Sequence, residues 1–178
     1  KAKLGPEHPD TLRSMNNLGG AYCAANQGEK AAATFKEFVA GRRKRSKPDD
    51  PQFAGLLAQV GLDLLKCRQH AAVEELLREC LAIREKKEPD VWTTFNTKSL
   101  LGGALLGQKK YADAEPLLLA GYEGLKQREK TIPPPGQVRI PEAIERLVQL
   151  YEATGKKDDA AKWRKELQTH KKLQKKSP

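Results

Sequence analysis

A pattern that returns about every 42 residues constrains this sequence more than any other feature. A large apolar residue precedes a small one at residues 18–19, 60–61 and 101–102, and a looser fourth copy lies at residues 147–148. The steps between these pairs are 42, 41 and 46 residues. A chain of 178 residues with such a period is a short array of repeated units and is too short for a large multidomain enzyme.

Each copy of the pattern predicts two antiparallel helices joined by a tight turn. In the first copy, Tyr22 lies three positions after the small residue of the pair and Ala31 lies twelve positions after it. These spacings place large and small side chains on one helical face. The small residue lets a second helix approach, and we expect the small residue of that helix to meet it. Asn26, Gly107 and Gly155 fall near the ends of first helices, where a left-handed residue can stop the helix.

Proline and aspartate mark the boundaries between units. They occur together at residues 9–10, 48–51 and 89–90, each ahead of a helical stretch. Proline ends the preceding helix, and the aspartate side chain can accept hydrogen bonds from the free amides that open the next one. The fourth boundary, residues 131–141, is longer and carries three consecutive prolines. It predicts a short extended connector, with an SH3-type ligand as the less favoured alternative.

The spacing of leucine-glycine, tyrosine and alanine resembles the tetratricopeptide repeat. The 42-residue period, with LGPEHPDTLRSMNNL at 4–18, LAIREKKEPD at 81–90 and YADAEPLLL at 111–119, resembles the kinesin-light-chain variety of that repeat. The resemblance covers nearly the whole chain and implies an all-α fold, a right-handed α-solenoid of about four antiparallel helix pairs. Similar arrays form C-terminal regions of bacterial serine/threonine kinases, which implies a region of a larger signalling protein.

The repeats divide the chain into consecutive segments: the tail of a preceding repeat (1–10), repeat 1 (11–48), repeat 2 (49–89), repeat 3 (90–130), a proline-rich connector (131–141), a terminal repeat 4 (142–170) and a basic tail (171–178). We expect at least one earlier repeat to have been removed. Its loss would expose an apolar edge on repeat 1, through which the chain could self-associate.

The resemblance implies a non-catalytic scaffold that binds a protein or peptide partner in a groove lined by the first helices. Positions counted from the leucine-glycine pair give the peptide-groove candidates Arg13, Asn16, Asn17, Gln59, Lys66, Asn96, Ser99, Glu145, Gln149 and Glu152. Amide side chains suit an extended peptide because each one both donates and accepts. For Asn17, a hydrogen bond to the neighbouring helix is an equal alternative. The carboxylates of repeat 4 would attract a basic segment or form a solvated face.

Positive charge gathers where second helices end. The formal net charge is +10, and the densest run holds the basic cluster Arg42, Arg43, Lys44, Arg45 and Lys47. Such a run could bind nucleic acid, acidic lipid or phosphate. Every second helix, however, ends in basic residues, which complement the negative end of the helix dipole. This repetition favours a structural role over a nucleic-acid site.

No residue set for catalysis, metal binding or a cofactor stands out. Residues 102–110 fall short of a phosphate-binding loop because Gln108 takes the place of its lysine and no strand precedes it. Cys67, His70 and Cys80 offer at most three metal ligands without paired zinc spacing, so we interpret His70 as a packed ring. We expect a chain that is not an enzyme.

Cysteine usage and hydropathy indicate a cytoplasmic setting. The three cysteines (Cys23, Cys67 and Cys80) form no CxxC pair, and their odd number argues against a disulfide framework. The longest apolar stretch, residues 100–106, is far too short to cross a membrane.

Overall fold

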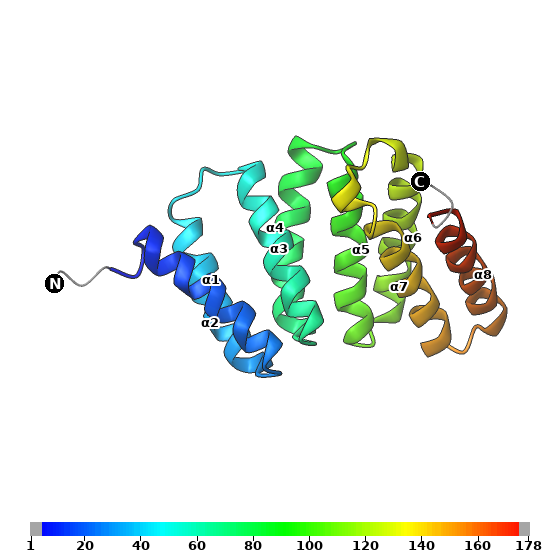
Figure 1. Ribbon diagram of the computed structural model, residues 1–178, viewed down its shortest axis with the longest axis horizontal. Helices are drawn as coiled ribbons and strands as arrows, with labels where there is room; N and C mark the ends of the chain where they lie inside the picture. Colours follow the sequence, from blue (N-terminus) through cyan, green and yellow to red (C-terminus); the bar gives the residue numbers. More distant parts are fainter. Residues whose placement is uncertain (1–4, 175–178) are drawn as a thin grey trace. The chain divides into compact units, whose positions relative to one another are not determined.

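The computed structural model describes residues 5–174, and over these residues all regular structure is helical (Figure 1). Within this range the α-helices are α1 (Pro9–Ala24), α2 (Gly28–Arg43), α3 (Pro51–Lys66), α4 (His70–Lys87), α5 (Trp92–Gly107), α6 (Tyr111–Gln127), α7 (Arg139–Ala153) and α8 (Lys157–Gln174). None of these helices is long and apolar enough to cross a bilayer. The all-α prediction is confirmed. Residues 1–4 and 175–178, parts of the predicted N-terminal and basic tails, lie outside the described residues.

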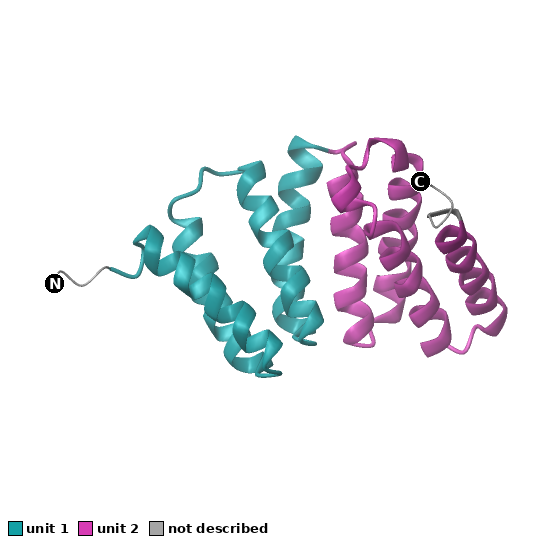
Figure 2. Ribbon diagram, viewed as in Figure 1, with its two compact units in different colours: residues 1–88 teal, residues 89–178 magenta. Residues whose placement is uncertain are grey.

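The chain divides into two compact units, with unit 1 ending at Glu88 and unit 2 beginning at Pro89 (Figure 2). Unit 1 holds hairpin 1 (α1 and α2) and hairpin 2 (α3 and α4). Unit 2 holds hairpin 3 (α5 and α6) and hairpin 4 (α7 and α8). The two helices of each hairpin pack on one another more extensively than on any other helix. Both tryptophans, Trp92 and Trp163, lie in unit 2.

The small residue of each leucine-glycine pair lies where the two helices of a hairpin touch. A Cβ atom on Gly19 would come within 2.8 Å of the ring of Phe35, and one on Gly61 within 2.8 Å of Leu77. Each glycine therefore meets a large side chain sixteen positions later. The expectation that two small residues would meet is wrong, because a large side chain fills the space left by the missing Cβ and keeps the interior closely packed.

A residue with positive φ ends the first helix of every hairpin. These residues are Asn26 (φ 57°), Arg68 (60°), Lys109 (62°) and Gly155 (72°), again 42, 41 and 46 positions apart. In all four turns the next amide bonds back to the carbonyl five residues earlier, as in the Schellman motif. Gly107 was expected to be left-handed and is instead the last residue of α5. The repeat geometry fixes the turn position, so it falls on lysine rather than on the nearby glycine.

Aspartate caps only one of the helices that follow a proline-aspartate signal. Asp50 accepts a hydrogen bond from the amide of Gln52 at 2.9 Å and caps α3, as predicted. At α1 the cap is His8, whose Nδ1 accepts from the amide of Asp10 at 3.2 Å. The N-cap of α5 is Val91, which makes no side-chain cap bond. The signal therefore locates helix starts but does not identify the capping residue.

The proline-rich segment before α7 is folded rather than extended. It contains two 3₁₀ turns, η1 (Glu129–Thr131) and η2 (Pro134–Gly136). Gln137 Nε2 donates to the carbonyl oxygens of Glu129 and Ile132, at 2.9 and 2.8 Å. The Ile132 side chain is buried. The prediction of an extended connector is wrong because these bonds and the buried isoleucine turn the segment back on itself.

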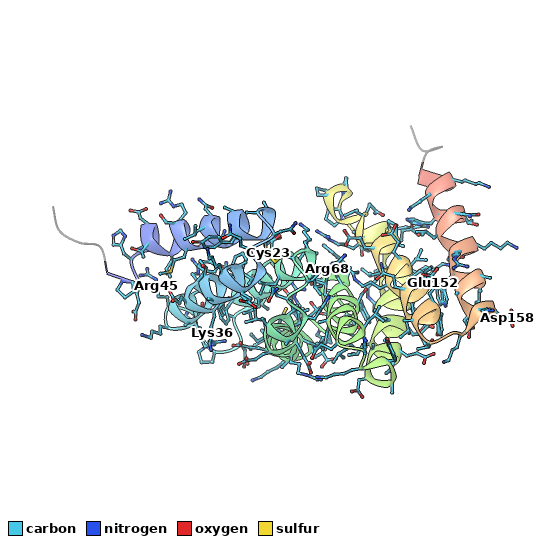
Figure 3. The ribbon with its side chains drawn as sticks, turned by 90° about the horizontal axis from the view of Figure 1, so that it is seen from below. Cys23, Lys36, Arg45, Arg68, Glu152 and Asp158 are labelled. Carbon is cyan, nitrogen blue, oxygen red and sulfur yellow. A yellow bond between two sulfur atoms is a disulfide. The ribbon has the colours of Figure 1, made fainter. Side chains whose placement is uncertain are left out.

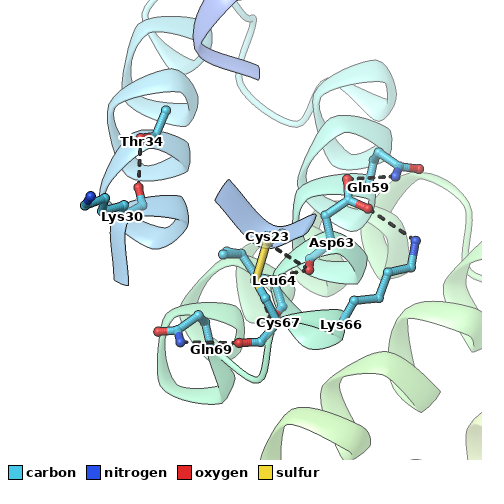
Figure 4. The surroundings of a disulfide bond; sticks show 9 residues. All are labelled: Cys23, Lys30, Thr34, Gln59, Asp63, Leu64, Lys66, Cys67 and Gln69. Carbon is cyan, nitrogen blue, oxygen red and sulfur yellow. Dashed lines mark hydrogen bonds and ion pairs between the residues drawn. A yellow bond between two sulfur atoms is a disulfide. The ribbon is translucent and has the colours of Figure 1, made fainter. Parts of the chain in front are cut away.

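A disulfide joins Cys23, in the last turn of α1, to Cys67, the C-cap of α3 (Figure 4). The two Cα atoms are 5.2 Å apart, a separation typical of disulfides. The expectation of no disulfide is wrong for this pair, while Cys80 is a buried thiol outside any disulfide. The two cysteines lie at different offsets from their leucine-glycine pairs, so only the approach of the two turns in space brings them together.

Candidate functional site

Unit 1 presents four of the predicted groove residues at its surface. Arg13, Asn16 and Asn17 of α1 and Gln59 of α3 are all exposed. Residues 13, 16 and 17 are three or four positions apart, so they share one face of α1. Asn17 makes no side-chain hydrogen bond to any residue that the structure describes. Its alternative role, a bond to the neighbouring helix, is therefore not observed.

A hollow of about 480 Å³ lies between α1, α2 and α3 of unit 1, and we call it the basic hollow. Its polar lining combines groove candidates with members of the basic cluster: Arg13, Asn16, Gln59, Arg42 and Arg45. The rest of its lining is apolar: Pro9, Leu12, Phe38, Leu56 and Val60. Sequence analysis treated the groove and the basic cluster as separate features, and the structure places members of both around one hollow.

The three arginines of the basic hollow keep most of their hydrogen-bond donors available. Arg13 pairs with Asp10 at 2.5 Å, and Arg45 Nη1 donates to the Glu7 carbonyl at 3.1 Å. Arg42 is exposed and forms no ion pair within residues 5–172. Because a guanidinium carries five donors, each arginine can still bind an incoming anion. The arrangement suits a carboxylate or phosphate next to an apolar side chain.

The other members of the basic cluster lie outside this hollow. Arg43 binds both oxygens of Glu79, at 2.6 and 3.2 Å, and this hydrogen bond raises the pKa of Arg43. Lys44 pairs with Glu7 at 2.6 Å. Lys47 is exposed. The run of five cations therefore does not act as one surface.

A second hollow, of about 340 Å³, lies between α2 and α4 of unit 1. Small and aliphatic side chains make up most of its lining: Ala32, Ala33, Val39, Ala40, Leu64, Ala72 and Leu76. Lys36, Arg43 and Glu75 complete it. Hairpins 1 and 2 thus leave space between them on two sides, one basic and one apolar.

Lys66 lies on α3 near the disulfide, away from the basic hollow. Its Nζ pairs with one carboxylate oxygen of Asp63 at 3.4 Å, and Gln59 Nε2 donates to the other at 3.0 Å (Figure 4). Gln59 is therefore held on the surface of α3 by Asp63, one turn further along the helix, while it lines the basic hollow.

In unit 2 the equivalent face is filled by a largely buried arginine side chain. Asn96 and Ser99 of α5 are buried, and Arg146 of α7 donates to Ser99 Oγ at 3.2 Å. A Cβ atom on Gly103 would lie 3.0 Å from Arg146 Cδ, so the arginine stem covers this part of α5. Burial lowers the pKa of Arg146, and the nearby carboxylate of Glu142, at 3.6 Å, opposes that shift.

Sequence reasoning missed Arg146, although the repeat contained a signal for it. Arg146 directly precedes the Leu147-Val148 pair, as Asn17 precedes Leu18-Gly19, so the two occupy the same repeat position. Asn96 also differs from expectation: only 8% of its surface is exposed, and its Oδ1 has no hydrogen-bond donor among the described residues. The role of Asn96 and Ser99 in partner binding stays a prediction.

The predicted acidic face of repeat 4 is largely paired within unit 2. Glu145 pairs with Lys171 of α8 at 2.9 Å. Arg164 Nε, also on α8, donates to Glu152 at 3.0 Å, and Figure 3 labels Glu152 of α7 and Asp158 in the first turn of α8. Gln149 is exposed. Cations of the chain itself therefore neutralise two carboxylates that were expected to attract a basic segment.

The near-miss motifs take ordinary structural roles. Residues 102–107 belong to α5 and residues 108–110 form the turn after it. Cys67 is held in the disulfide, and burial lowers the pKa of His70, with Arg68 adding to the effect. Among the described residues, no three His, Cys, Asp or Glu side chains gather as a metal site would require.

Comparison with known proteins supports the repeat assignment. Residues 11–52 match the family model of the tetratricopeptide repeat. Two crystal structures of nearly identical TPR-like repeats, from a Podosopora anserina protein described as a kinesin light chain, are similar to the whole chain. One, a point variant, is 20% identical with a TM-score of 0.73 and covers 98% of this chain and 81% of its own. The other is 20% identical with a TM-score of 0.69, covering 98% and 82%.

No curated protein matches the sequence. At 20% identity, the two structures show the fold alone. Together with the match of residues 11–52 to the tetratricopeptide-repeat model, they show that the chain adopts a helix-pair fold like that of the two kinesin-light-chain-like structures, as the sequence spacing predicted.

Proposed function

We propose that this chain, which carries a tetratricopeptide repeat, is a non-catalytic scaffold whose unit 1 binds an extended partner segment in the basic hollow. The carrying observation is that hollow, where Arg13, Arg42 and Arg45 surround an apolar floor. Positive charge and apolar surface lie side by side in this hollow. A ligand that is only acidic or only apolar would therefore leave part of the lining without a complementary contact.

The chemistry of the hollow defines the partner. Its arginines favour a carboxylate or phosphate group, because guanidinium donors match the geometry of both anions. Asn16 and Gln59 offer amides that both donate and accept, as the backbone of an extended peptide requires. The buried side chains of Leu12, Phe38 and Val60 provide an apolar base. The proposed partner is therefore a protein segment with acidic and apolar residues close together.

We place the binding site in unit 1 rather than unit 2 because different residues occupy the repeat position just before the leucine-glycine pair. Asn17 is exposed in repeat 1, whereas the corresponding Arg146 is largely buried on Gly103 and Ser99. A segment lying on α5 and α7 would have to displace a guanidinium that is already hydrogen-bonded. The cost of that displacement disfavours binding there.

Nucleic-acid binding is the weaker alternative. Arg43 and Lys44, the centre of the basic cluster, are paired with carboxylates of unit 1. A nucleic-acid site would need several unpaired cations along one surface, so that phosphate contacts accumulate. The cytoplasmic setting and the wider signalling context stay predictions.

Panning a random dodecapeptide library against the full chain tests the proposal. Enriched peptides should carry aspartate or glutamate beside a large apolar residue. The best of them, labelled with fluorescein, should bind Arg42→Ala about tenfold more weakly in fluorescence polarisation, because one charged contact is lost. Arg42 has no structural ion pair, so the variant should keep its circular dichroism spectrum.

Lys47→Ala is the matched control, since it removes an exposed cation of the same cluster from outside the hollow. The control should bind the peptide as the unmodified chain does. Enrichment of basic peptides, or equal loss of affinity in both variants, would contradict the proposed site.

A further inference from the structure

We propose that Cys23 and Cys67 form a redox-interconvertible clasp that holds hairpin 1 against hairpin 2 and so fixes the opening of the basic hollow. The proposed effect on peptide affinity rests on the proposed function. The clasp itself does not, and it has its own readouts.

The disulfide and the basic hollow lie at opposite ends of the same helix pair. Cys23 is the penultimate residue of α1, whereas Pro9 and Arg13 line the hollow from the first half of that helix. Ten residues separate Cys23 from Arg13, or about 15 Å along the helix. Figure 3 shows Cys23 and Arg45 at different ends of hairpin 1, and Figure 1 shows the turns of hairpins 1 and 2 close together while their other ends diverge.

Hairpins 1 and 2 are in tight contact near the clasp, and the exposed Arg43–Glu79 ion pair, at 2.6 Å, joins them near the other end of α2. A Cβ atom on Gly28 would lie 2.2 Å from Gln69 Nε2, and Gln69 itself bonds to the Cys67 carbonyl at 3.3 Å. Away from the turns, the same two hairpins leave the basic hollow between them. The covalent link therefore fixes the spacing of the two hairpins at one end, and we expect its opening to let hairpin 1 change its angle and with it the width of the basic hollow.

The site can accommodate the two thiols as well as the disulfide. Both sulfur atoms lie 3.4 Å from the carbonyl oxygen of Asp63, which can accept a hydrogen bond from either thiol after reduction (Figure 4). Neither cysteine is buried. Cys80, in contrast, is 0% exposed, so it provides an internal reference thiol that the redox reagent does not reach.

Glutathione disulfide and glutathione supply the chemistry by thiol–disulfide exchange. One protein thiolate attacks glutathione disulfide and releases one glutathione thiolate, leaving a mixed disulfide. The second protein thiolate then attacks the protein sulfur of that mixed disulfide and releases the second glutathione. Two protons and two electrons leave the protein pair and appear in two molecules of glutathione. The reverse sequence reduces the clasp.

Reduction should weaken peptide binding. With the clasp closed, the arginines and the apolar floor, which come from both hairpins, are held at a fixed spacing. With it open, hairpin 1 samples further orientations, and the peptide must order them before it can contact both hairpins. We therefore expect about tenfold lower affinity after reduction.

The first experiment follows the clasp without any peptide. The full chain is equilibrated with glutathione disulfide or with glutathione, then labelled with N-ethylmaleimide under native conditions and analysed by peptide mass spectrometry. Glutathione should make Cys23 and Cys67 reactive while Cys80 stays unlabelled. Hydrogen exchange of the amides of residues 12–16 should become at least tenfold faster in the reduced chain. Failure of Cys23 to pair with Cys67, or unchanged exchange, would overturn the proposal.

The second experiment measures binding of the fluorescein-labelled peptide obtained by panning. Oxidised chain should bind about tenfold more tightly than reduced chain. Cys23→Ser should bind like the reduced chain in either buffer, and comparison of the two redox forms of the unmodified chain excludes misfolding as the cause. Equal affinity of the two forms would overturn the regulatory role. If panning yields no peptide, the proposed function fails, and the labelling and exchange results still decide whether the clasp exists.

Discussion

Units 1 and 2 each consist of two hairpins, but the contacts between the two hairpins differ between the units. In unit 1, hairpins 1 and 2 are joined by the Cys23–Cys67 disulfide and by the Arg43–Glu79 pair, and two hollows remain between them. In unit 2, polar and aromatic contacts bridge hairpins 3 and 4 at several levels. The difference shows that one repeat pattern can produce either an accessible surface or a sealed one.

The contacts of unit 2 form two clusters around tyrosines. Tyr122 donates to Glu166 at 2.6 Å and packs edge-on against Trp163, with ring centroids 4.9 Å apart. Tyr151 donates to Glu115 at 2.9 Å. Each carboxylate also binds a lysine, Lys126 for Glu166 and Lys156 for Glu115. These contacts join hairpin 4 to hairpin 3 at several points along their length.

The largest expected effect on stability comes from replacing a tightly packed glycine of unit 2, compared with an unobstructed glycine of unit 1. A Cβ atom on Gly121 would lie 2.6 Å from the backbone nitrogen of Ser99, whereas one on Gly20 would meet nothing within 4 Å. Gly121→Ala should cost about 3 kcal/mol, because backbone cannot move aside cheaply. Urea unfolding followed by tryptophan fluorescence measures this, since both tryptophans lie in unit 2.

Gly20→Ala is the matched control and should stabilise the chain by about 0.5 to 1 kcal/mol, through helix propensity. Circular dichroism reports this change, because unit 1 has no tryptophan. Equal effects of the two alanines would remove the contrast in packing between the units.

A second, smaller effect is expected from Arg146, the residue that fills the face of unit 2. Arg146→Ala should lower stability by about 2 kcal/mol, because it leaves a cavity on Gly103 and an unpaired Ser99 hydroxyl. Arg146→Met keeps the apolar stem and removes a buried charge, so it should stay within about 1 kcal/mol of the unmodified chain. Chemical denaturation measures both, and a larger loss in Met than in Ala would refute the packing explanation.

The smallest effect is a pH dependence specific to unit 2. Hydrogen bonds from Lys156 and Lys126 lower the pKa values of Glu115 and Glu166 in the folded state. Their contribution to stability is therefore present above the unfolded pKa and is lost as pH falls through the lowered folded values. The fluorescence-detected melting temperature should fall by a few degrees at acid pH. Replacing both carboxylates by glutamine should flatten this fall, whereas Glu123→Gln, on exposed α6 surface, should leave it unchanged.

The two tyrosine clusters of unit 2 also predict a loss of stability at alkaline pH. Burial, followed by hydrogen bonding to the carboxylates, raises the pKa of Tyr122 and of Tyr151 to about 12. Stability from the neutral phenols is thus complete below the unfolded pKa near 10 and is lost as pH rises to about 12. Tyrosine ionisation followed by ultraviolet absorbance would show whether unfolding accompanies it.

The repeat period of the sequence predicted the helices well, because the repeated small residues lie where the two helices of a hairpin touch. Gly19, Gly61 and Gly102 each lie where the second helix of the hairpin approaches, so their spacing located hairpins 1 to 3. Residue type was a poorer guide to single positions. Gly107 suggested a left-handed turn, and the turn fell on Lys109, since the geometry of the repeat outweighs the conformational preference of one residue.

The candidate site was only partly predictable, because it depends on contacts between hairpins. Counting from the leucine-glycine pair found Arg13 and Asn16 of α1 and Gln59 of α3, which line the basic hollow. It could not show that Arg42, in the last turn of α2, and Arg45, in the turn after it, would reach the same hollow. Nor could it show that Cys23 and Cys67 would meet, since their separation in sequence does not equal the period.

The four hairpin turns differ in the steric cost of the positive φ that each requires. Asparagine and glycine tolerate positive φ at Asn26 and Gly155, in the first and last hairpins, whereas Arg68 and Lys109 adopt it against a steric penalty. Both strained positions are exposed in the turns of their hairpins, and neither lines the basic hollow. A glycine at either position would remove the steric penalty of positive φ, so Arg68→Gly and Lys109→Gly offer simple routes to a more heat-stable chain.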